Sequence, residues 1–573
     1  MPPGRPGYGN GSALAHVDSD VSASLSHSTR QPTSTGGDND VRHTRSQDSE
    51  QTLQHDPTII RDESPDVVDV EKGIKATKDG QPNASAKRLA TDGSPVIVLD
   101  WDKDDPEFPQ NWPRKQRLAA TFVVAAFTFL SPLSSTMIAP CSGEVARALG
   151  METDIERQMV TSIFVLAYAF GPLLLGPSSE IWGRAKVLQL ANLVYLVFNL
   201  MCAFAQTKAQ FFVFRLLAGL GGSAPLAIGA GVLGDLWRPA ERGTAASLYS
   251  LGPLLGPAVG PIAGGWIAQT LPDDGWKWVF YSTSIFCAGV QTVGLFFLRE
   301  TYAPVLLGRR VKAKKKELGL SMESDKVQTI YDLKGRKSYG HVVSHGLVKP
   351  FVLFAAERIL NVLALYLAII YGMIYLITTT TTTIFTDVYG QSVGIAGTHF
   401  VAQGLGFLVG AQANGRILDR MYRKLQASNN DIGQPEFRLP VMVPASIILP
   451  AGIFLYGWTA QARGHWIGVD FGMAFVAAAM ISIFQSTNLY LVDSFGIYAA
   501  SAIASVTFWR SLCGFAFPIF APALFQALGY GGGASLLAGI VILVGCPAAP
   551  VLWKYGERIR MSSRFAAKRK EGA

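Results

Sequence analysis

Long apolar runs alternate with short polar segments over most of this 573-residue chain. A run of about 20 residues, at roughly 1.5 Å rise per residue, spans roughly 30 Å of bilayer hydrocarbon as a helix. Six such runs in the first half are 118–139, 159–178, 187–206, 211–234, 244–268 and 278–298. Six in the second half are 359–386, 394–414, 440–460, 468–491, 497–523 and 534–553. The pattern predicts an all-α integral membrane protein with twelve transmembrane helices.

The polar segments divide the chain into five parts. Residues 1–98 are rich in Ser, Thr, Asp and Gly and poor in aromatics, so they bury too little apolar surface to offset the entropy of ordering, and we expect a disordered tail. Residues 99–299 and 351–555 carry six spans each. A polar loop, 300–350, containing "RRVKAKKK" lies between them, and a basic tail, 556–573, follows.

Composition and charge agree with a membrane protein. Only 16% of the residues are charged and the mean hydropathy is +0.25, whereas a soluble domain has about 25% charged residues. The net charge is +8. The basic residues lie between and after the apolar runs, as the positive-inside rule requires, so the charge does not indicate a nucleic-acid partner. We expect a monomer in the plasma membrane, with both termini and the 300–350 loop in the cytosol.

The sequence offers little for catalysis or metal binding. Its five cysteines are widely spaced, with no CxxC pair or Cys/His cluster, so neither a zinc site nor a disulfide framework is indicated. No GxxxxGK[ST] phosphate loop is present. A membrane enzyme would need a cluster of His, Asp or Cys within the spans, and none is visible. We therefore expect no enzymatic activity, no cofactor and no metal.

A charged patch occurs twice at equivalent places. Gly176, Glu180 and Arg184 are spaced by four residues after the second span, and Gly415, Asp419 and Arg423 repeat this spacing after the second span of the other half. Gly176 would allow close helix approach, and the acid would pair with a neighbouring helix of its own half, forming a latch that can open and close. The alternative is a turn whose charges only set topology. The latch residues expected are Gly176, Glu180, Gly183, Arg184, Lys186, Asp235, Asp419 and Arg423.

Several stretches resemble one transporter family. "GPLLLGPSSEIWGRAKV" resembles the motif between helices two and three of the major facilitator superfamily, with Glu180 replacing the usual Asp. "RLLAGLGGSAPLAIGAGV" resembles the arginine motif of helix four, and "GPLLGPAVGPIAGG" the Gly-Pro motif of helix five in antiporters. "NLYLVDSFGIYAASA", "RETYAP" and "DPEFPQNW" are similar to fungal drug/proton antiporters with twelve spans. The resemblance covers about residues 101–555 and implies two six-helix pseudo-repeats and alternating access.

The fifth span has small residues on one face. Glycines four residues apart favour close packing on a neighbouring helix, and prolines bend the helix. The resemblance implies that this bend blocks ion leak and favours exchange. The residues are Gly252, Pro253, Gly256, Pro257, Gly260 and Gly264.

Ionisable residues within or near the spans are candidates for coupling and transport, because charge in a bilayer is costly. Arg215 and Arg510 lie inside spans; the alternative is that each binds only neighbouring carbonyls. Glu357 and His399 are candidate proton carriers, although Glu357 could pair with Arg358 and His399 could serve packing. Hydroxyls of residues 378–383, all Thr, could line a wet path, but we favour bonds to their own helix carbonyls.

Aromatic and amide side chains suit a cavity for a bulky organic ligand. The candidates are Tyr371, Tyr375, Gln403, Gln485, Asn488 and Trp509. We expect a secondary transporter that exports a drug, toxin or secondary metabolite, driven by the proton gradient. A non-coupled facilitator, an importer of polyamines or organic acids, and a transporter-derived membrane sensor remain alternatives.

Overall fold

The computed structural model describes residues 96–102, 104–238, 241–271, 274–321, 324, 326–332, 339–563 and 565–566. All of these belong to one compact unit. The predicted disordered tail, up to residue 95, and the end of the predicted basic tail lie outside the described residues.

The first six predicted spans correspond to helices. Two short helices, α5 and α6, meet at Ser223 and together form the fourth span. The helices are α1 (Arg114–Met137), α2 (Ser142–Ala148), α3 (Asp154–Trp182), α4 (Arg184–Ala203), α5 (Lys208–Gly222), α6 (Ala224–Leu236), α7 (Arg242–Thr270) and α8 (Gly275–Phe297).

The second half repeats this arrangement. Its helices are α11 (Arg358–Thr383), α12 (Val393–Thr398), α13 (Phe400–Ser428), α14 (Met442–Gln461), α15 (Ile467–Phe495) and α16 (Ala499–Met561). Gly529 breaks α16 with a φ of 70°, so α16 contains both the eleventh and the twelfth predicted span. For this reason 11 helices among the described residues are long and apolar enough to cross a membrane.

The segment between the halves is partly folded. It contains α9 (Ala303–Glu317), strand β2 (Val327–Thr329) and α10 (Tyr339–Ala356). Strand β1 (Ile97–Leu99), just before the first span, pairs with β2 in parallel, with Ile97 opposite Val327. The observed elements therefore cross three predicted boundaries: β1 begins before residue 99, α10 runs past 350, and α16 runs past 556.

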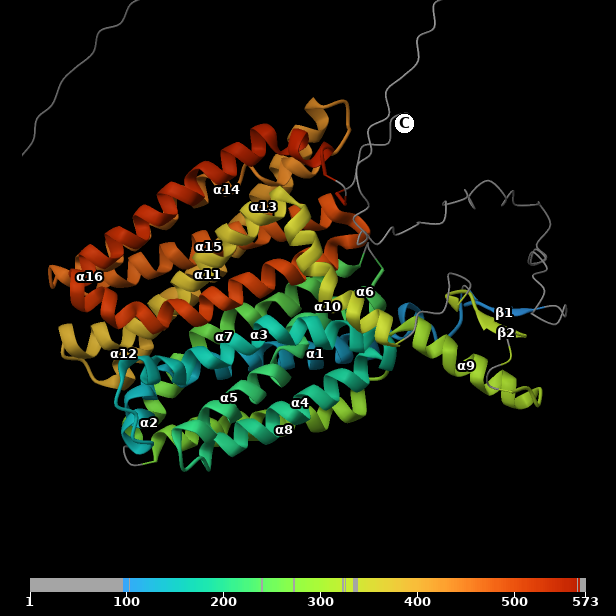
Figure 1. Cartoon of the computed structure of the whole chain (residues 1–573), viewed down its shortest axis with the longest axis horizontal. Coiled ribbons are helices and arrows are strands. Elements are labelled where there is room, and N and C mark those ends of the chain that lie inside the picture. Colours follow the sequence, from blue (N-terminus) through green and yellow to red (C-terminus); the bar gives the residue numbers. More distant parts are fainter. Residues whose placement is uncertain are drawn as a thin grey trace, which may run out of the picture. The chain divides into compact units, whose positions relative to one another are not determined.

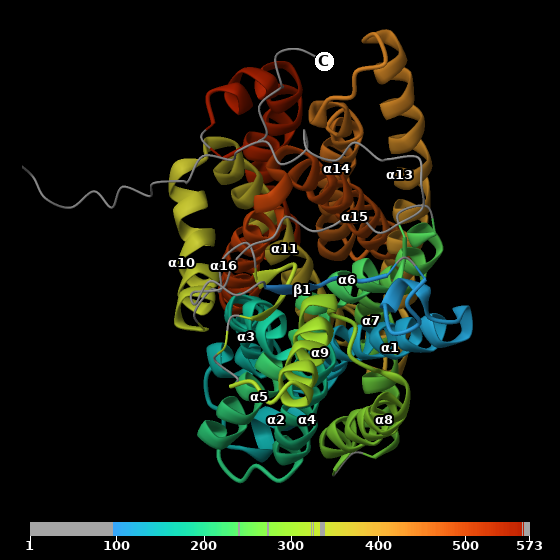
Figure 2. The same cartoon turned by 90° about the vertical axis from the view of Figure 1, so that its right-hand side faces the viewer.

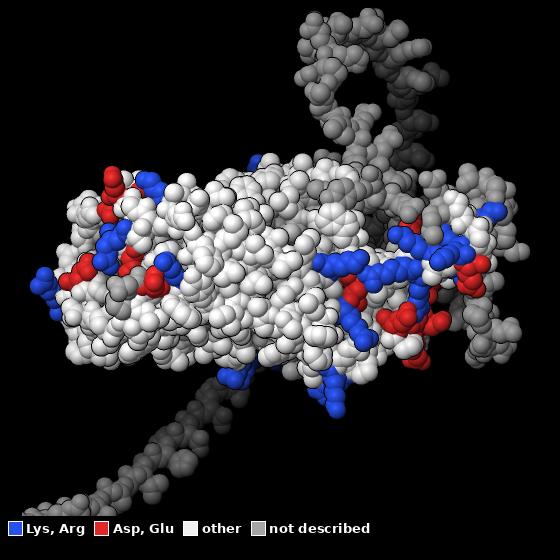
Figure 3. All heavy atoms as spheres, turned by 90° about the horizontal axis from the view of Figure 1, so that it is seen from below, with Lys and Arg blue, Asp and Glu red and all other residues white. Residues whose placement is uncertain are grey.

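The spanning helices lie side by side along one direction (Figure 1). We call the end of the bundle with α9, β1 and β2 the linker end and the end with α2 and α12 the distal end. Charged side chains gather at these two ends, and the face between them is almost free of charge (Figure 3). Figure 2 looks onto the linker end, with α9 and β1 in front of the helices. This distribution is that of a chain crossing a bilayer many times.

Helix α7 packs against α1 through its glycine face. A Cβ atom on Gly264 would lie 1.9 Å from the carbonyl oxygen of Met137, and one on Gly256 would lie 2.8 Å from the backbone nitrogen of Leu133. Gly252 and Gly260 face the same helix equally closely. Three prolines lie within α7. Only hydrogen at these α-carbons permits such an approach of two backbones.

Candidate functional site

A buried carboxylate closes the turn between α3 and α4. Gly183 has a φ of 102°, a conformation that side chains rarely adopt, and a Cβ there would lie 2.0 Å from Oε2 of Glu300. Oε1 of Glu300 accepts hydrogen bonds from the backbone N–H groups of Arg184 (2.8 Å), Thr301 (3.1 Å) and Tyr302 (3.0 Å). The end of the sixth span is thereby fixed to the turn after the second.

Arg184 links this turn to the fourth span. Its Nε donates to Oδ2 of Asp235 over 2.8 Å, and its guanidinium lies 4.9 Å from the ring centre of Tyr302. Burial raises the pKa of Tyr302 to about 12, so this ring stays neutral. Asp235 is next to the last residue of α6, where a negative charge is unfavourable without a cation. We call Arg184, Asp235 and Glu300 the first clamp.

Three expected latch residues lie outside this contact. Glu180 is exposed and, among the described residues, has no hydrogen-bond or ion-pair partner. Lys186 is exposed as well. The expectation that Gly176 permits close helix approach is wrong, because a Cβ there would meet nothing within 4 Å. The carboxylate at this turn is Glu300, which sequence reasoning missed although it lies in the "RETYAP" stretch.

The second half has an equivalent arrangement made by other residues. Nε of Arg438, in the 3-10 helix Pro435–Arg438, donates to Oδ2 of Asp493 over 3.0 Å near the end of α15. Glu436 binds Arg560 near the end of α16 over 2.8 Å, with both side chains buried. We call Arg438, Asp493, Glu436 and Arg560 the second clamp.

Asp419 and Arg423, the residues expected in this role, lie at its edge. Asp419 is 69% exposed and approaches Arg438 only to 3.9 Å. Nε of Arg423 donates to the carbonyl of Asp419 over 3.2 Å. The prediction that these two side chains form the second latch is therefore corrected: Arg438 and Asp493 make the close ion pair. No spacing in the sequence singles out Arg438.

Arg215 is completely enclosed in the first half. It is 0% exposed. Its guanidinium donates to the carbonyls of Val160 (3.3 Å) and Ser134 (3.4 Å) and lies 4.6 Å from the ring centre of Phe164. These contacts hold α5 against α1 and α3. In this conformation Arg215 binds neighbouring carbonyls rather than facing an open path.

Arg510 has a different environment. It lies in α16 with its guanidinium 4.6 Å from the ring centre of Tyr371 and 5.1 Å from that of Phe484. The Tyr371 ring lies 5.2 Å from that of Tyr375. The hydroxyls of Tyr375 and Ser135 are 3.3 Å apart, which joins the two halves. The structure thus brings Tyr371, Tyr375 and Arg510 together.

The other cavity candidates do not join this group. Gln403 is fully buried, and neither atom of its amide has a partner among the described residues. Gln485 accepts a hydrogen bond from Asn414 over 3.0 Å, and Trp509 packs on Phe354. Asn488 is half-buried on α15. Among the described residues, no hydrogen bond or ring contact connects these four to Tyr371 or Tyr375.

Four of the six threonine hydroxyls bond to carbonyls of their own helix, as expected, whereas the hydroxyl of Thr382 has no partner among the described residues. The hydroxyls of Thr378, Thr380 and Thr381 donate to carbonyls one turn earlier over 2.7–2.9 Å. Thr379 does the same three residues back. The run therefore supports α11, and Tyr456 adds contacts to two of its hydroxyls.

His399 lies in a polar cluster at the distal end. Its Nδ1 is 2.9 Å from Oδ2 of Asp470, and its Nε2 is 2.8 Å from Oε1 of Gln391. The imidazole stacks on Phe385, with ring centres 3.7 Å apart. Asp470 lies in the first turn of α15 and was not predicted as a site residue.

Glu357 has a structural environment at the linker end. It is 3% exposed, and its Oε1 accepts a hydrogen bond from the backbone nitrogen of Phe565 over 3.1 Å. The Phe565 ring packs edge-on against Tyr498. Glu357 therefore fastens the segment after α16 to the start of α11.

An ion-pair group ties the segment before α1 to α9. Arg310 donates to both carboxylate oxygens of Asp105 and binds Glu107 over 2.7 Å. The hydrogen bond from Arg310 holds the pKa of Asp105 below its usual range. The Trp101 ring lies 4.7 Å from the same guanidinium. Together with the β1–β2 pair, these contacts make a short strap across the linker end.

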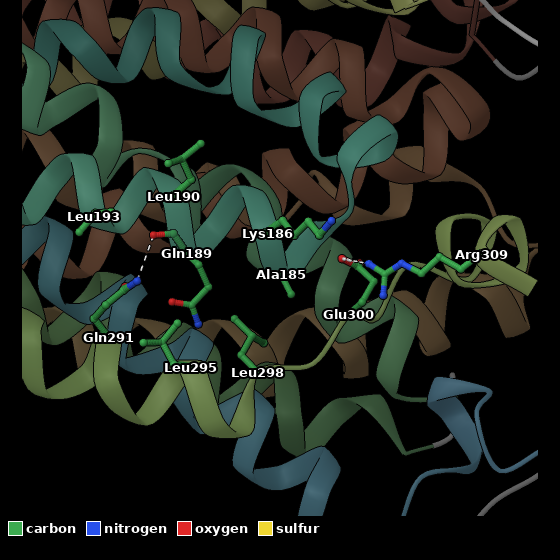
Figure 4. Close-up of a pocket in the computed structure, with 10 residues that line it drawn as sticks. All are labelled: Ala185, Lys186, Gln189, Leu190, Leu193, Gln291, Leu295, Leu298, Glu300 and Arg309. Carbon is green, nitrogen blue, oxygen red and sulfur yellow. Dashed lines mark hydrogen bonds and ion pairs between the residues drawn. The ribbon is translucent and has the colours of Figure 1, made fainter. Parts of the chain in front are cut away.

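A surface groove lies between α4 and α8 (Figure 4). Its volume is about 530 Å³, and Leu190, Leu193 and Leu295 line its apolar part. Lys186 and Arg309 stand at its linker end, with Glu300 4.0 Å from Arg309. The groove is thus separate from the Arg510 cluster. Among the described residues no group of three or more His, Cys, Asp or Glu could hold a metal ion.

Comparison with known proteins places these features in context. A family model described as Major Facilitator Superfamily matches residues 124–518. The efflux pump vrtL of Penicillium aethiopicum is 44% identical over 82% of this chain and 92% of its own length. The efflux pump radE of Floropilus chiversii is 39% identical over 82% of this chain and 86% of its own.

Solved structures share the fold at low identity. The xylose transporter XylE from E. coli, in a partially occluded inward-open conformation, matches with a TM-score of 0.55 and 15% identity. The match covers 77% of this chain and 98% of that one. At this identity the likeness concerns the fold alone.

Proposed function

Because the chain belongs to the major facilitator superfamily, a family of multi-pass membrane transporters and not of enzymes, we propose that it exports a small organic solute by alternating access in exchange for protons. The observation that carries this proposal is the presence of a clamp at the linker end of each half. The names of two relatives, both called efflux pumps, support the direction of transport.

Each clamp holds its own half together, so that the half can move as a rigid unit. In each half an arginine neutralises an aspartate at the end of the fourth span of that half, Arg184 with Asp235 and Arg438 with Asp493. A carboxylate at a helix C-terminus has an unfavourable interaction with the helix dipole, which the arginine offsets. Each half therefore moves as one body, and access to a central site changes by rocking of one body against the other.

Proton exchange is assigned to His399 and Asp470. Among the described residues in the second half, this pair joins an imidazole to a carboxylate at the distal end, with His399 between α12 and α13 and Asp470 in the first turn of α15. Binding of a proton changes the net charge of the pair, and so changes the free energy of moving it between water and the closed distal end. Release on the opposite side completes one exchange.

We further propose that the chain acts as a monomer in the plasma membrane with both termini in the cytosol. The linker end then faces the cytosol, because Lys and Arg concentrate there. The two N-x-S sites at Asn10 and Asn83 provide a check. Glycosylation of either asparagine in the expressed protein would contradict this orientation.

Export is tested by deleting the gene in the producing fungus and comparing intracellular and extracellular metabolites by mass spectrometry. We expect one compound to accumulate inside, and the wild-type chain to restore its release. Asp235→Asn and Asp493→Asn should insert normally but fail to restore release. Glu180→Gln, an exposed side chain without a partner, is the matched control. If no compound redistributes, export is refuted; if uptake falls instead, the chain is an importer.

Coupling is tested in proteoliposomes with a pH-sensitive dye and the compound identified by deletion. We expect His399→Gln and Asp470→Asn to abolish solute-driven proton movement while preserving exchange of labelled for unlabelled solute. Unchanged proton movement in both variants would remove this pair from the mechanism.

A further inference from the structure

The two arginines within the spans differ in what surrounds them. Arg215 is 0% exposed and donates to two backbone carbonyls, although its Nη2 has no hydrogen-bond partner among the described residues. Arg510 is half-buried, and its Nε has no hydrogen-bond partner among the described residues. Its neighbours are the faces of two aromatic rings, Tyr371 and Phe484. A guanidinium held only by ring faces retains its capacity to bind an anion with two parallel hydrogen bonds.

Unpartnered donors continue along α16 around Arg510. Within the described part of the chain, the buried side-chain donors of Ser505, Trp509 and Ser511 also have no hydrogen-bond partner. Buried polar atoms in proteins are nearly always hydrogen-bonded, so a cluster of exceptions indicates a place where water or a ligand completes the bonding. All four side chains can donate a hydrogen bond. Successive residues of a helix point about 100° apart, so only Arg510, which lies against Tyr371 and Phe484, is assigned to the ligand.

Arg510 lies about midway along its predicted span. It lies roughly 17 Å along the helix from Ala499, at about 1.5 Å rise per residue, which is near the middle of roughly 30 Å of hydrocarbon. One turn later, a Cβ on Gly514 would meet Tyr371 of its own half at 3.0 Å and Val165 of the other half at 3.1 Å. Arg510 therefore lies beside the interface between the two halves.

Four described carboxylates near the spans pair with other side chains. Asp235 binds Arg184, Asp493 binds Arg438 and Glu436 binds Arg560. Asp470 pairs with His399. No ion pair joins any described carboxylate to Arg510. An unpaired cation inside a membrane is costly and marks a functional position.

We propose that Arg510 binds an acidic group of the transported solute, a carboxylate or an ionised phenol, while Tyr371 and Phe484 contact its apolar body. This inference rests on the proposed function and names its substrate class: organic anions with an aromatic or other apolar frame. Arg510 donates two hydrogen bonds to the acidic group. A neutral or cationic analogue leaves the guanidinium unpaired and binds weakly.

The test measures ligand-induced thermal stabilisation of the purified full-length chain. The probes are aromatic carboxylic acids of one to four rings, each paired with its primary amide, which has a similar shape but no charge. We expect at least one acid to bind the wild type tenfold or more tightly than its amide. Arg510→Gln should lose this preference, and Arg510→Lys, which retains only a point charge, should keep a reduced preference. Arg423→Gln, at an exposed position, should behave as the wild type.

Two outcomes would overturn the inference. Equal binding of acids and amides by the wild type refutes an anion site, and undiminished acid preference in Arg510→Gln refutes Arg510 as its centre. Thermal stability without ligand shows whether each variant is folded. The proposed function fails separately: selective acid binding without metabolite release in the deletion experiment refutes export only. Release of a neutral compound that Arg510→Gln also restores refutes the anion site only.

Discussion

At the scale of single residues, Glu300 connects the end of the sixth span to the turn between α3 and α4. One of its oxygens accepts three backbone N–H groups, and the other leaves no room for a side chain at position 183. The repeated spacing in the sequence predicts Glu180 as the acidic latch residue, but its side chain is exposed. Spacing along one helix identifies residues on one face, but it does not identify the partner that arrives from a segment more than a hundred residues away.

Glu300→Ala should destabilise the protein clearly. The substitution leaves the backbone N–H groups of Arg184 and Tyr302 without their acceptor, and each unsatisfied buried donor costs about 1–3 kcal/mol. The midpoint of thermal unfolding in detergent should fall, and transport should fall with it. Glu180→Ala should change the free energy of unfolding by no more than about 0.5 kcal/mol. Equal stability of the two variants would contradict the assignment of Glu300 to the first clamp.

At the scale of elements, the apolar runs predicted the spanning helices well. The run lengths fix these helices because lipid leaves the backbone no partner outside the helix. The linker-end elements were not predictable in this way. The β1–β2 pair has three residues in each strand, too few for a periodic pattern, and its partners are separated by six spans. The residues of the second clamp likewise meet only after α13, α15 and α16 have packed.

Gly264→Ala tests the contact between α7 and α1. The added methyl would lie 1.9 Å from a carbonyl oxygen of α1, so the helices must separate. We expect a loss of about 1–3 kcal/mol in unfolding free energy, as for other overpacked cores. Gly289→Ala in α8 meets nothing within 4 Å and should gain up to about 1 kcal/mol from helix propensity. Chemical denaturation in micelles measures both; a stable Gly264→Ala variant would contradict the contact.

The strap should loosen in acid. Because Arg310 lowers the pKa of Asp105 in the folded chain, ionised Asp105 stabilises the strap at pH values above its unfolded pKa of about 3.9. That stabilisation is lost as the pH falls below about 4 and through the lower folded value. The protection factors of residues 97–112 in amide hydrogen exchange, which correct for the intrinsic pH dependence of the exchange rate, should therefore fall in this range. Asp105→Asn should show fast exchange at neutral pH too, and an identical pH profile in both proteins would exclude this role.

At the scale of the whole molecule, the halves repeat a plan with different residues. Both place an aspartate at the end of the fourth span and neutralise it with an arginine from the loop after the second span. At the end of the sixth span, however, the first half has a glutamate, Glu300, and the second an arginine, Arg560. The family resemblance predicted the repeat of the two halves. The opposite charges of Glu300 and Arg560 at the ends of the two sixth spans became apparent only from the contacts in the folded chain. The halves meet at the distal end, where Gln526 donates to Asp154 over 3.2 Å.

Cross-linking the distal contact should stop transport. Asp154→Cys with Gln526→Cys, joined by a short bifunctional thiol reagent, ties the two halves together and prevents rocking. After cleavage of the 300–350 segment, the cross-link should hold the N-terminal and C-terminal fragments together. If the reagent forms disulfides with the two cysteines, reduction of these disulfides should restore flux. Glu156→Cys with Lys208→Cys lies within one half and should cross-link without joining fragments or blocking transport. Both pairs need Cys513 and Cys546 replaced by Ser. Full flux in the cross-linked first pair would exclude rocking.

The pairing of β1 with β2 has a consequence for biogenesis. Residues 97–99 leave the ribosome early, but their partner, residues 327–329, follows only after six hydrophobic segments have been synthesised. The β1–β2 pair can therefore form only after the six spans of the first half have been synthesised. A nascent chain arrested before residue 327 would leave the segment before α1 open to protease, whereas one arrested after α10 would protect it.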